Sequence, residues 1–250
     1  DYIVTKVARF PFDKFSDASN KLGTQMKATG EVMSIGRTME ESLLKAVRSL
    51  ETGVCHIYHK KFDKWSNDDL LAYIKGGTDD RLYAIGQLIR NGVDLALIYD
   101  KTKIDMFFLE KFKNIVEFEN VVRAHPMDVE TLRAAKRMGF SDKYIGQLWG
   151  LSQNEMYRLR EKNNVFPVYK MIDTCASEFA SYVPYFYSTY EEENESIVSG
   201  KEKIIVLGSG PIRIGQGVEF DYSTVHAIWS IRAAGYEAII INNNPETVST

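Results

Sequence analysis

The spacing of hydrophobic and polar residues divides the chain into three parts. In the first part, residues 1–5 are extended and apolar, and Thr38 precedes a segment in which leucine and valine recur on one helical face. Threonine is a common N-cap, and the acidic Glu40 and Glu41 suit the positive end of a helix. We therefore expect residues 1–51 to form the end of an α/β domain that closes with a helix.

The second part, residues 52–199, has the pattern of short amphipathic helices. Apolar residues repeat with the helical period between capping residues and glycine or proline stops. No strand pattern interrupts them, so we expect an all-helical domain, and the acidic run 191–195 beside Ser199 predicts an exposed linker at its end. The predicted helices span residues 68–75, 79–91, 105–124, 128–138, 141–149 and 152–162.

The third part, residues 200–250, alternates strand, loop, helix and strand. Residues 203–207 are a β-branched run of the kind buried in parallel sheets, and a glycine-rich loop and a helix over 222–234 follow. Gly235 is placed to end this helix, and residues 238–241 form the second strand. The predicted fold class is therefore mainly α, with a central all-helical domain flanked by partial α/β segments.

A single βαβ unit leaves most of its apolar strand faces uncovered, because three or more strands are normally needed for independent stability. The chain also begins without an initiator Met, in what reads as a strand already under way. We therefore expect these residues to be an internal piece of a longer polypeptide.

The composition disfavours several classes of protein. Hydrophobic residues make up 44% and charged residues 26% of the chain, which is typical of an ordinary globular protein. The net charge of −3 provides no general attraction for nucleic acids or anionic membranes, and no apolar run is long enough to cross a bilayer. Cys55 and Cys175, without an export signal, suit a reducing cytoplasm better than a disulfide framework. We expect a cytoplasmic protein that binds neither nucleic acid nor membrane.

The glycine-rich loop is the clearest candidate for binding. Its glycines let backbone N–H groups approach an anion, and the following helix adds its positive end. A dinucleotide site is disfavoured, because an arginine interrupts the glycine fingerprint and asparagines, not an acidic residue, end the second strand. No Gly-Lys-Ser/Thr follows as in a P-loop, and a tight turn without a ligand is the alternative. We predict a loop for an anion or carboxylate formed by Gly208, Gly210, Arg213, Gly215 and Gln216.

Residues 141–160 have the pattern of a helix-turn-helix. Its second helix would carry Gln153, Asn154, Arg158 and Arg160. The charge argues against DNA, because residues 141–164 hold four basic and three acidic side chains, a net charge of +1. We expect two packed helices joined by a capped turn.

No metal site is predicted. Cys55, His56 and His59 are close in sequence, but a structural zinc site needs four ligands and no second Cys/His cluster exists in the sequence.

Three stretches together resemble the large subunit of carbamoyl phosphate synthetase. One resembles the close of that family's first half, one the end of its helical oligomerisation domain, and one the opening of its second, carbamate-phosphorylating half. The stretches are residues 5–10 with 25–38, residues 167–179 with 187–192, and residues 208–222 with 242–250.

The resemblance implies a division into domains and an activity. Residues 1–51 would be the C-terminal tail of the first ATP-grasp half, residues 52–199 the oligomerisation domain, and residues 200–250 the βαβ start of the second half's pre-ATP-grasp domain. The implied enzyme is an allosteric ligase of arginine and pyrimidine biosynthesis, which makes carbamoyl phosphate from bicarbonate, ammonia and two ATP. A free-standing nucleotide- or DNA-binding module is the alternative.

The resemblance also bears on cofactors, partners and sites. The family binds ATP with Mg or Mn in the central parts of each half, which this sequence lacks, so no catalytic residue, metal ligand or bound cofactor is implied here. The implied partners are a glutaminase small subunit, the rest of the large subunit, and further copies through the helical domain. Met26, Gly217 and Glu219 align with residues that line the family's internal tunnel.

Two further expectations concern single residues. Phe107, Phe112 and Trp149 are expected inside the helical domain or at a self-association surface. Gly217 lies two residues before Glu219. Either the backbone at Gly217 is held close to a molecule that must pass or fit there, or this segment is a plain turn with a solvated carboxylate.

Overall fold

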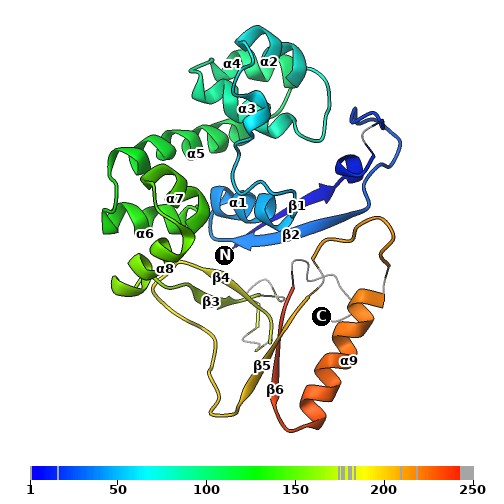
Figure 1. Ribbon diagram of the computed structural model, residues 1–250, viewed down its shortest axis with the longest axis vertical. Helices are drawn as coiled ribbons and strands as arrows, with labels where there is room; N and C mark the ends of the chain where they lie inside the picture. Colours follow the sequence, from blue (N-terminus) through cyan, green and yellow to red (C-terminus); the bar gives the residue numbers. More distant parts are fainter. Residues whose placement is uncertain are drawn as a thin grey trace.

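The computed structural model describes residues 2–15, 17–173, 175, 178–179, 182, 184–208, 210–217 and 219–242, with Phe220 described by its backbone alone. Figure 1 shows a hairpin region (residues 2–51) in the middle, a helical region (52–164) above and beside it, and a βαβ region (200–242) below. A connecting segment (165–199) runs between the helical and βαβ regions. No helix of the described residues is long and apolar enough to span a membrane.

The hairpin region consists of two antiparallel strands with a helix packed on them. Strand β1 (Ile3–Arg9) pairs with β2 (Gly30–Gly36) along its whole length, and the short 3-10 helix η1 (Pro11–Asp13) follows β1. Helix α1 (Met39–Ser49) begins where the sequence predicts, because the Thr38 hydroxyl accepts a hydrogen bond from the Glu41 backbone N–H at 3.2 Å. The predicted strand and helix are confirmed, whereas β2 was not predicted.

The helical region confirms the six helices predicted from sequence, to within about three residues at their ends. One further helix, α4, was not predicted; it spans eight residues and buries only Ile98. The elements are η2 (Lys60–Phe62), α2 (Asn67–Ile74), α3 (Arg81–Arg90), α4 (Leu95–Thr102), α5 (Met106–Ala124), α6 (Val129–Arg137), α7 (Asp142–Trp149) and α8 (Gln153–Lys162).

The main hydrophobic core lies inside the helical region and extends into α1. Leu109, Phe112 and Ile115 on the long helix α5 are buried in it, and Leu44 of α1 belongs to the same cluster. Each fully buried side chain of this size stabilises the fold by roughly 1.5–3 kcal/mol. The shared core therefore fixes the helical region against the hairpin region.

The connecting segment corrects one prediction. Residues 52–199 were expected to be all-helical, but β3 (Val168–Met171) pairs antiparallel with β4 (Phe186–Thr189). Each strand has four residues, which is too short for a period of two to stand out from noise. The acidic run that follows β4 is exposed and has no regular structure, as predicted for a linker.

The βαβ region has the predicted order of elements. Strands β5 (Lys203–Leu207) and β6 (Glu237–Ile241) are parallel, with helix α9 (Glu219–Ala233) between them. Gly235 ends the helix with a φ of +90°, a conformation that favours glycine. Burial of the strands on both faces is not found within the described chain, since Leu207 is 74% and Ile241 54% exposed.

Candidate functional site

The glycine loop connects β5 to α9, as the sequence predicts. Gly210 and Gly215 have φ values of +74° and +82°, which glycine adopts without strain. The Gly208 backbone N–H donates to the Ile241 carbonyl at 2.8 Å, and a Cβ on Gly208 would overlap the Asn242 side chain. The loop therefore leaves β5 close beside the end of β6, where the lack of a side chain on Gly208 lets the two segments approach.

The loop packs against the N-terminal end of β2 in the hairpin region. The Thr29 hydroxyl donates a hydrogen bond to the Ile212 carbonyl at 3.1 Å. A Cβ on Gly30 would lie 3.1 Å from both the Ile212 Cβ and the Ile212 carbonyl oxygen. Glycine at position 30 thus lets the loop backbone approach the hairpin closely.

An ion pair joins the same two regions. The Arg213 guanidinium binds the carboxylate of Glu51, which follows α1, and both side chains are about half exposed. A Cβ on Gly210 would lie 2.8 Å from the Glu51 Oε1 atom, so the carboxylate sits directly over the loop. The predicted cation of the loop is therefore paired with a carboxylate of the chain itself, and binding of an external anion stays a prediction.

The side chains of Gln216 and Glu219 accept hydrogen bonds from backbone N–H groups of the loop itself. The Gln216 Oε1 atom accepts the Arg213 backbone N–H at 3.1 Å, and the Glu219 Oε1 atom accepts the Gly217 N–H at 3.0 Å. These two bonds hold the turn between β5 and α9 in one shape. Of the predicted tunnel residues, Met26 is 85% exposed, and Glu219 is exposed at the start of α9.

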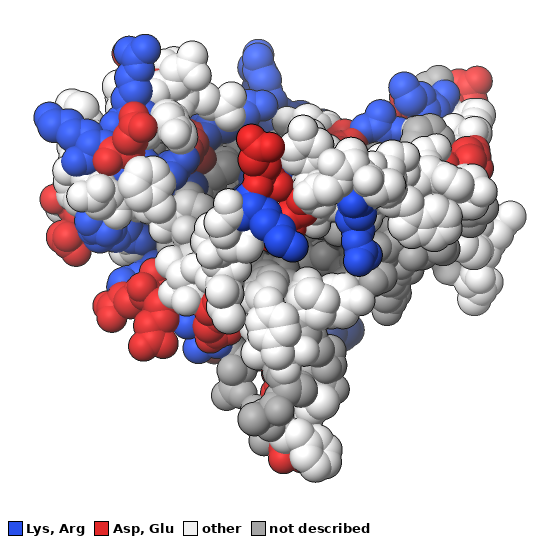
Figure 2. All heavy atoms as spheres, turned by 90° about the horizontal axis from the view of Figure 1, so that it is seen from below, with Lys and Arg blue, Asp and Glu red and all other residues white. Residues whose placement is uncertain are grey.

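Helices α7 and α8 form the predicted packed pair. Ser152 and Glu155 make the predicted capping box, and Gly150 ends α7 in the left-handed conformation. Arg160, a candidate for phosphate contact, is buried and binds Asp142 with Nη2 at 2.8 Å. On the face shown in Figure 2, basic and acidic side chains are interspersed, unlike the single-sign surface of a nucleic-acid binder.

His56 belongs to a buried polar cluster of the helical region. Its Nε2 atom lies 3.0 Å from Glu119 Oε1, its ring stacks on Tyr144 with centroids 3.8 Å apart, and Arg90 Nε donates to Glu119 Oε2 at 2.9 Å. Burial lowers the pKa of His56 to about 4, while hydrogen bonds from His56 and Arg90 outweigh burial and lower the pKa of Glu119 to about 2. His59 instead caps η2 by accepting the Lys61 N–H.

Sequence reasoning missed the residues that receive the loop. Thr29 and Glu51 are separated from the loop by more than 150 positions, and no local pattern marks either of them. Phe112 is buried as expected, and the Trp149 Nε1–H donates to the Val122 carbonyl at 2.6 Å. Phe107 is 51% exposed beside Phe108, so it does not belong to the core.

Comparison with protein families assigns two parts of the chain. Residues 31–164, more than half of the chain, match the family model described as carbamoyl-phosphate synthetase large chain, oligomerisation domain. Residues 200–250 match the model described as carbamoyl phosphate synthase preATP-grasp domain. The first match extends from β2 to just beyond α8, and the second contains the glycine loop.

Proposed function

The chain belongs to the carbamoyl phosphate synthetase large-chain family, and from this premise we propose that it forms the joint between the two phosphorylating halves of the ligase. The complete enzyme would make carbamoyl phosphate from bicarbonate, ammonia and two ATP. The alternative, a free-standing nucleotide- or DNA-binding module, is not supported by the family matches.

The observation that carries this proposal is the contact between the glycine loop and the hairpin region. Ile212 and Arg213 belong to the preATP-grasp match, whereas Glu51 lies in the oligomerisation match. Two regions that are far apart in sequence thus meet at the hydrogen bond from Thr29, at Gly30 and at the ion pair.

We propose that carbamate passes from one half to the other beside the exposed residues of the glycine loop. Because Gly217 has no side chain, the Glu219 carboxylate can lie beside the backbone there, where it accepts the Gly217 N–H. Met26, three residues before Thr29, would line the same route. Carbamate is unstable in water, so a sheltered route between the two sites would protect it.

The residues present do not fit a metal site. Within the described ranges, no group of three or more His, Cys, Asp or Glu side chains could hold a metal ion. We propose that ATP and Mg or Mn act in other parts of the complete enzyme, where a glutaminase small subunit supplies the ammonia. The exposed faces of β5 and β6 would be covered by the rest of the large subunit.

Self-association follows from the oligomerisation domain, and we propose the surface that supports it. Leu97 and Tyr99 on α4 and Phe107 and Phe108 on α5 are each at least 40% exposed. Helices α4 and α5 pack together, so these apolar side chains can form one patch that a second copy would cover.

Two measurements on the purified chain test this assignment. Sedimentation should show association for the chain and for the control Tyr157→Ser, whose aromatic ring is exposed on α8, but at least tenfold weaker association for Phe107→Ser/Phe108→Ser. The chain alone should neither hydrolyse ATP nor make carbamoyl phosphate, because the catalytic parts lie elsewhere. Bicarbonate-dependent ATP hydrolysis by the chain, or a monomer at every concentration, would contradict the assignment.

A further inference from the structure

A pocket lies in the helical region between helix α7 and the segment that follows α1, residues 52–60. Its volume is about 280 Å³, near the lower end, roughly 300 Å³, of the pockets that hold small organic ligands. Helix α7 contributes Lys143, Tyr144 and Gln147 to the wall, and the segment contributes the remaining residues. The pocket is therefore of a size for a small organic molecule.

The lining of this pocket is positively charged. Lys60 and Lys143 both belong to it, and none of the described residues that line it is Asp or Glu. The side chain of neither lysine makes an ion pair or a hydrogen bond within the described part of the chain. An ammonium group has three donors and no acceptor, so an anionic group is the partner that suits these two side chains.

The carboxylates close to these lysines in sequence already have partners. Asp142, which precedes Lys143, binds an ammonium and a guanidinium of the helical region at 2.8 Å each. Asp63, three residues after Lys60, accepts the Tyr58 hydroxyl at 2.8 Å. The charge of the pocket is therefore not balanced by acidic residues beside it in the sequence.

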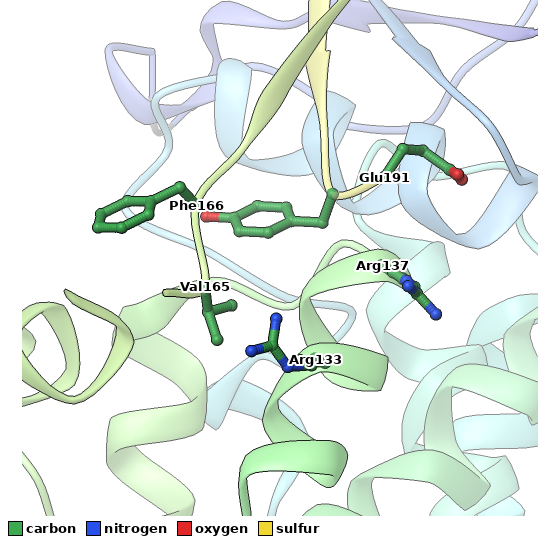
Figure 3. Close-up of a pocket in the computed structure, with 6 residues that line it drawn as sticks. Arg133, Arg137, Val165, Phe166 and Glu191 are labelled. Carbon is green, nitrogen blue, oxygen red and sulfur yellow. The ribbon is translucent and has the colours of Figure 1, made fainter. Parts of the chain in front are cut away.

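The smaller pocket shown in Figure 3, between α6 and the connecting segment, lacks these properties. Its volume is about 40 Å³, and the guanidinium groups of Arg133 and Arg137 point in different directions there. Glu191 also lines it, and Glu192 lies 3.8 Å from Arg137. Its positive groups are thus dispersed and already accompanied by carboxylates.

The rest of the larger pocket's wall offers apolar surface and further donors. Val54 and Tyr144 supply apolar surface, and both pack on the core of the helical region. Gln147 supplies a side-chain amide. His59 accepts the Lys61 backbone N–H with Nδ1, so its Nε2 atom carries the proton and is a donor. A molecule that suits this lining has an anionic group and an apolar body.

We propose that this pocket binds a small organic acid, whose carboxylate or phosphate group lies beside Lys60 and Lys143 and whose apolar body lies against Val54 and Tyr144. Carboxylates and phosphate monoesters share the required chemistry, because both present oxygens that accept from an ammonium group. Lys60 begins η2 and Lys143 belongs to α7, so a bound acid would join these two elements.

Ligand-detected NMR of the full 250-residue chain at constant ionic strength tests the proposal, with benzoate and phenyl phosphate as probes. Saturation transfer to the ring protons of benzoate should reach a plateau, and benzamide, which lacks the charge, should bind about tenfold or more weakly. Lys60→Gln/Lys143→Gln should weaken benzoate binding by the same factor. The matched control is Lys75→Gln/Lys162→Gln, which removes two exposed lysines that also lack ion pairs and should bind like the unmodified chain.

A second readout uses the unmodified chain and does not depend on the stability of a variant. Cys55 is partly buried in the pocket wall, whereas Cys175 lies in the connecting segment. At about ten times its Kd, benzoate should slow alkylation of Cys55 by iodoacetamide about tenfold, because only roughly one pocket in eleven is then free. Alkylation of Cys175 should keep its rate, and mass spectrometry follows both sites.

The two probes distinguish the sources of the anionic group. Binding of benzoate alone assigns the pocket to carboxylic acids, and binding of both probes assigns it to phosphate monoesters as well. Equal binding of benzamide and benzoate, equal binding by the two double variants, or an unchanged rate at Cys55 would overturn the proposal.

Discussion

The guanidinium of Arg213 pairs with the carboxylate of Glu51, which joins the glycine loop to the end of α1 across 162 positions of sequence. Because both groups are about half exposed, the pair itself contributes at most about 1 kcal/mol. The ion pair instead helps to fix the position of the loop. The close approach of the Gly30 backbone to Ile212 fixes the same part of the loop.

The first prediction concerns this pairing. Glu51→Gln and Arg213→Gln should each increase hydrogen exchange at residues 210–217, because either change leaves the loop with fewer contacts to the hairpin region. The charge-reversed double variant Glu51→Arg/Arg213→Glu should recover most of the protection. Equal exchange in all four proteins would show that the pair does not hold the loop.

Gly210→Ala should release the loop more strongly. The φ of +74° costs a residue with a Cβ about 1–2 kcal/mol, and the new Cβ would lie 2.8 Å from Glu51 Oε1. Hydrogen exchange should therefore rise further than in the Glu51→Gln variant. The double variant Gly210→Ala/Glu51→Ala, which removes the side chain that the new Cβ would meet, separates the two causes: any protection it regains comes from that contact, and the remainder is backbone strain.

The packing of α7 on α8 predicts the sign of a helix substitution. Helix propensity alone favours Ala over Gly by about 1 kcal/mol, but overpacking a core costs about 1–3 kcal/mol. A Cβ on Gly146 would lie 2.5 Å from the Leu151 carbonyl, which cannot move without shifting the turn between the helices. Gly146→Ala should therefore destabilise the chain in urea unfolding.

The control for that substitution is Gly77→Ala, whose added Cβ would lie 3.9 Å from the nearest atom, the Leu22 carbonyl oxygen. It should change the free energy of unfolding by less than about 0.5 kcal/mol. Stabilisation by Gly146→Ala would show that the turn yields and that propensity dominates.

The buried His56 predicts how stability depends on pH. Its pKa falls from about 6.5 in the unfolded chain to about 4 in the folded one, so between these values the unfolded chain binds a proton that the folded chain does not. Stability should therefore be full above pH 6.5 and decrease as the pH falls from about 6.5 to about 4, by on the order of 1–3 kcal/mol. Glu119, whose pKa is lowered to about 2, adds a loss below about pH 4.5.

Urea unfolding at pH 7 and pH 5 measures this slope. His56→Gln should flatten the dependence between these two values, while His226→Gln, which changes an exposed histidine on α9, should leave it as it was. The same slope in His56→Gln and the unmodified chain would assign the titration to other groups.

Local signals in the sequence account for most of what could be predicted. The Ser152 and Glu155 capping box and the Thr38 N-cap are made within one turn of chain, so sequence spacing shows them. The strands β3 and β4 were missed because four residues carry too little pattern. Their pairing also joins residues that are 15 to 21 positions apart, from Met171 with Phe186 to Val168 with Thr189.

The loop of the candidate site could be predicted from the sequence, but the residues of the hairpin region that contact it could not. Gly208 and Gly210 mark the loop by residue type, since backbone that closely approaches another group or has a positive φ favours glycine. Nothing near Thr29 or Glu51 in the sequence indicates that they meet this loop, because such contacts depend on how whole regions pack.

The most direct test of the proposed joint is Gly217→Phe in the complete enzyme. A Cβ at Gly217 would lie 2.6 Å from Glu219 Oε2, so a phenyl group there must displace that carboxylate and fill the proposed passage. Bicarbonate-dependent ATP cleavage and ATP formation from carbamoyl phosphate should each persist. Overall synthesis from ammonia should fall about tenfold or more, an added barrier of about 1.4 kcal/mol.

The matched control is Gly200→Phe, where no atom lies within 4 Å of the added Cβ. It should support overall synthesis at the rate of the unmodified enzyme, with both partial reactions intact. If a passage lies at Gly217, overall synthesis should be lost in Gly217→Phe alone, and an unchanged rate in that variant would contradict such a passage.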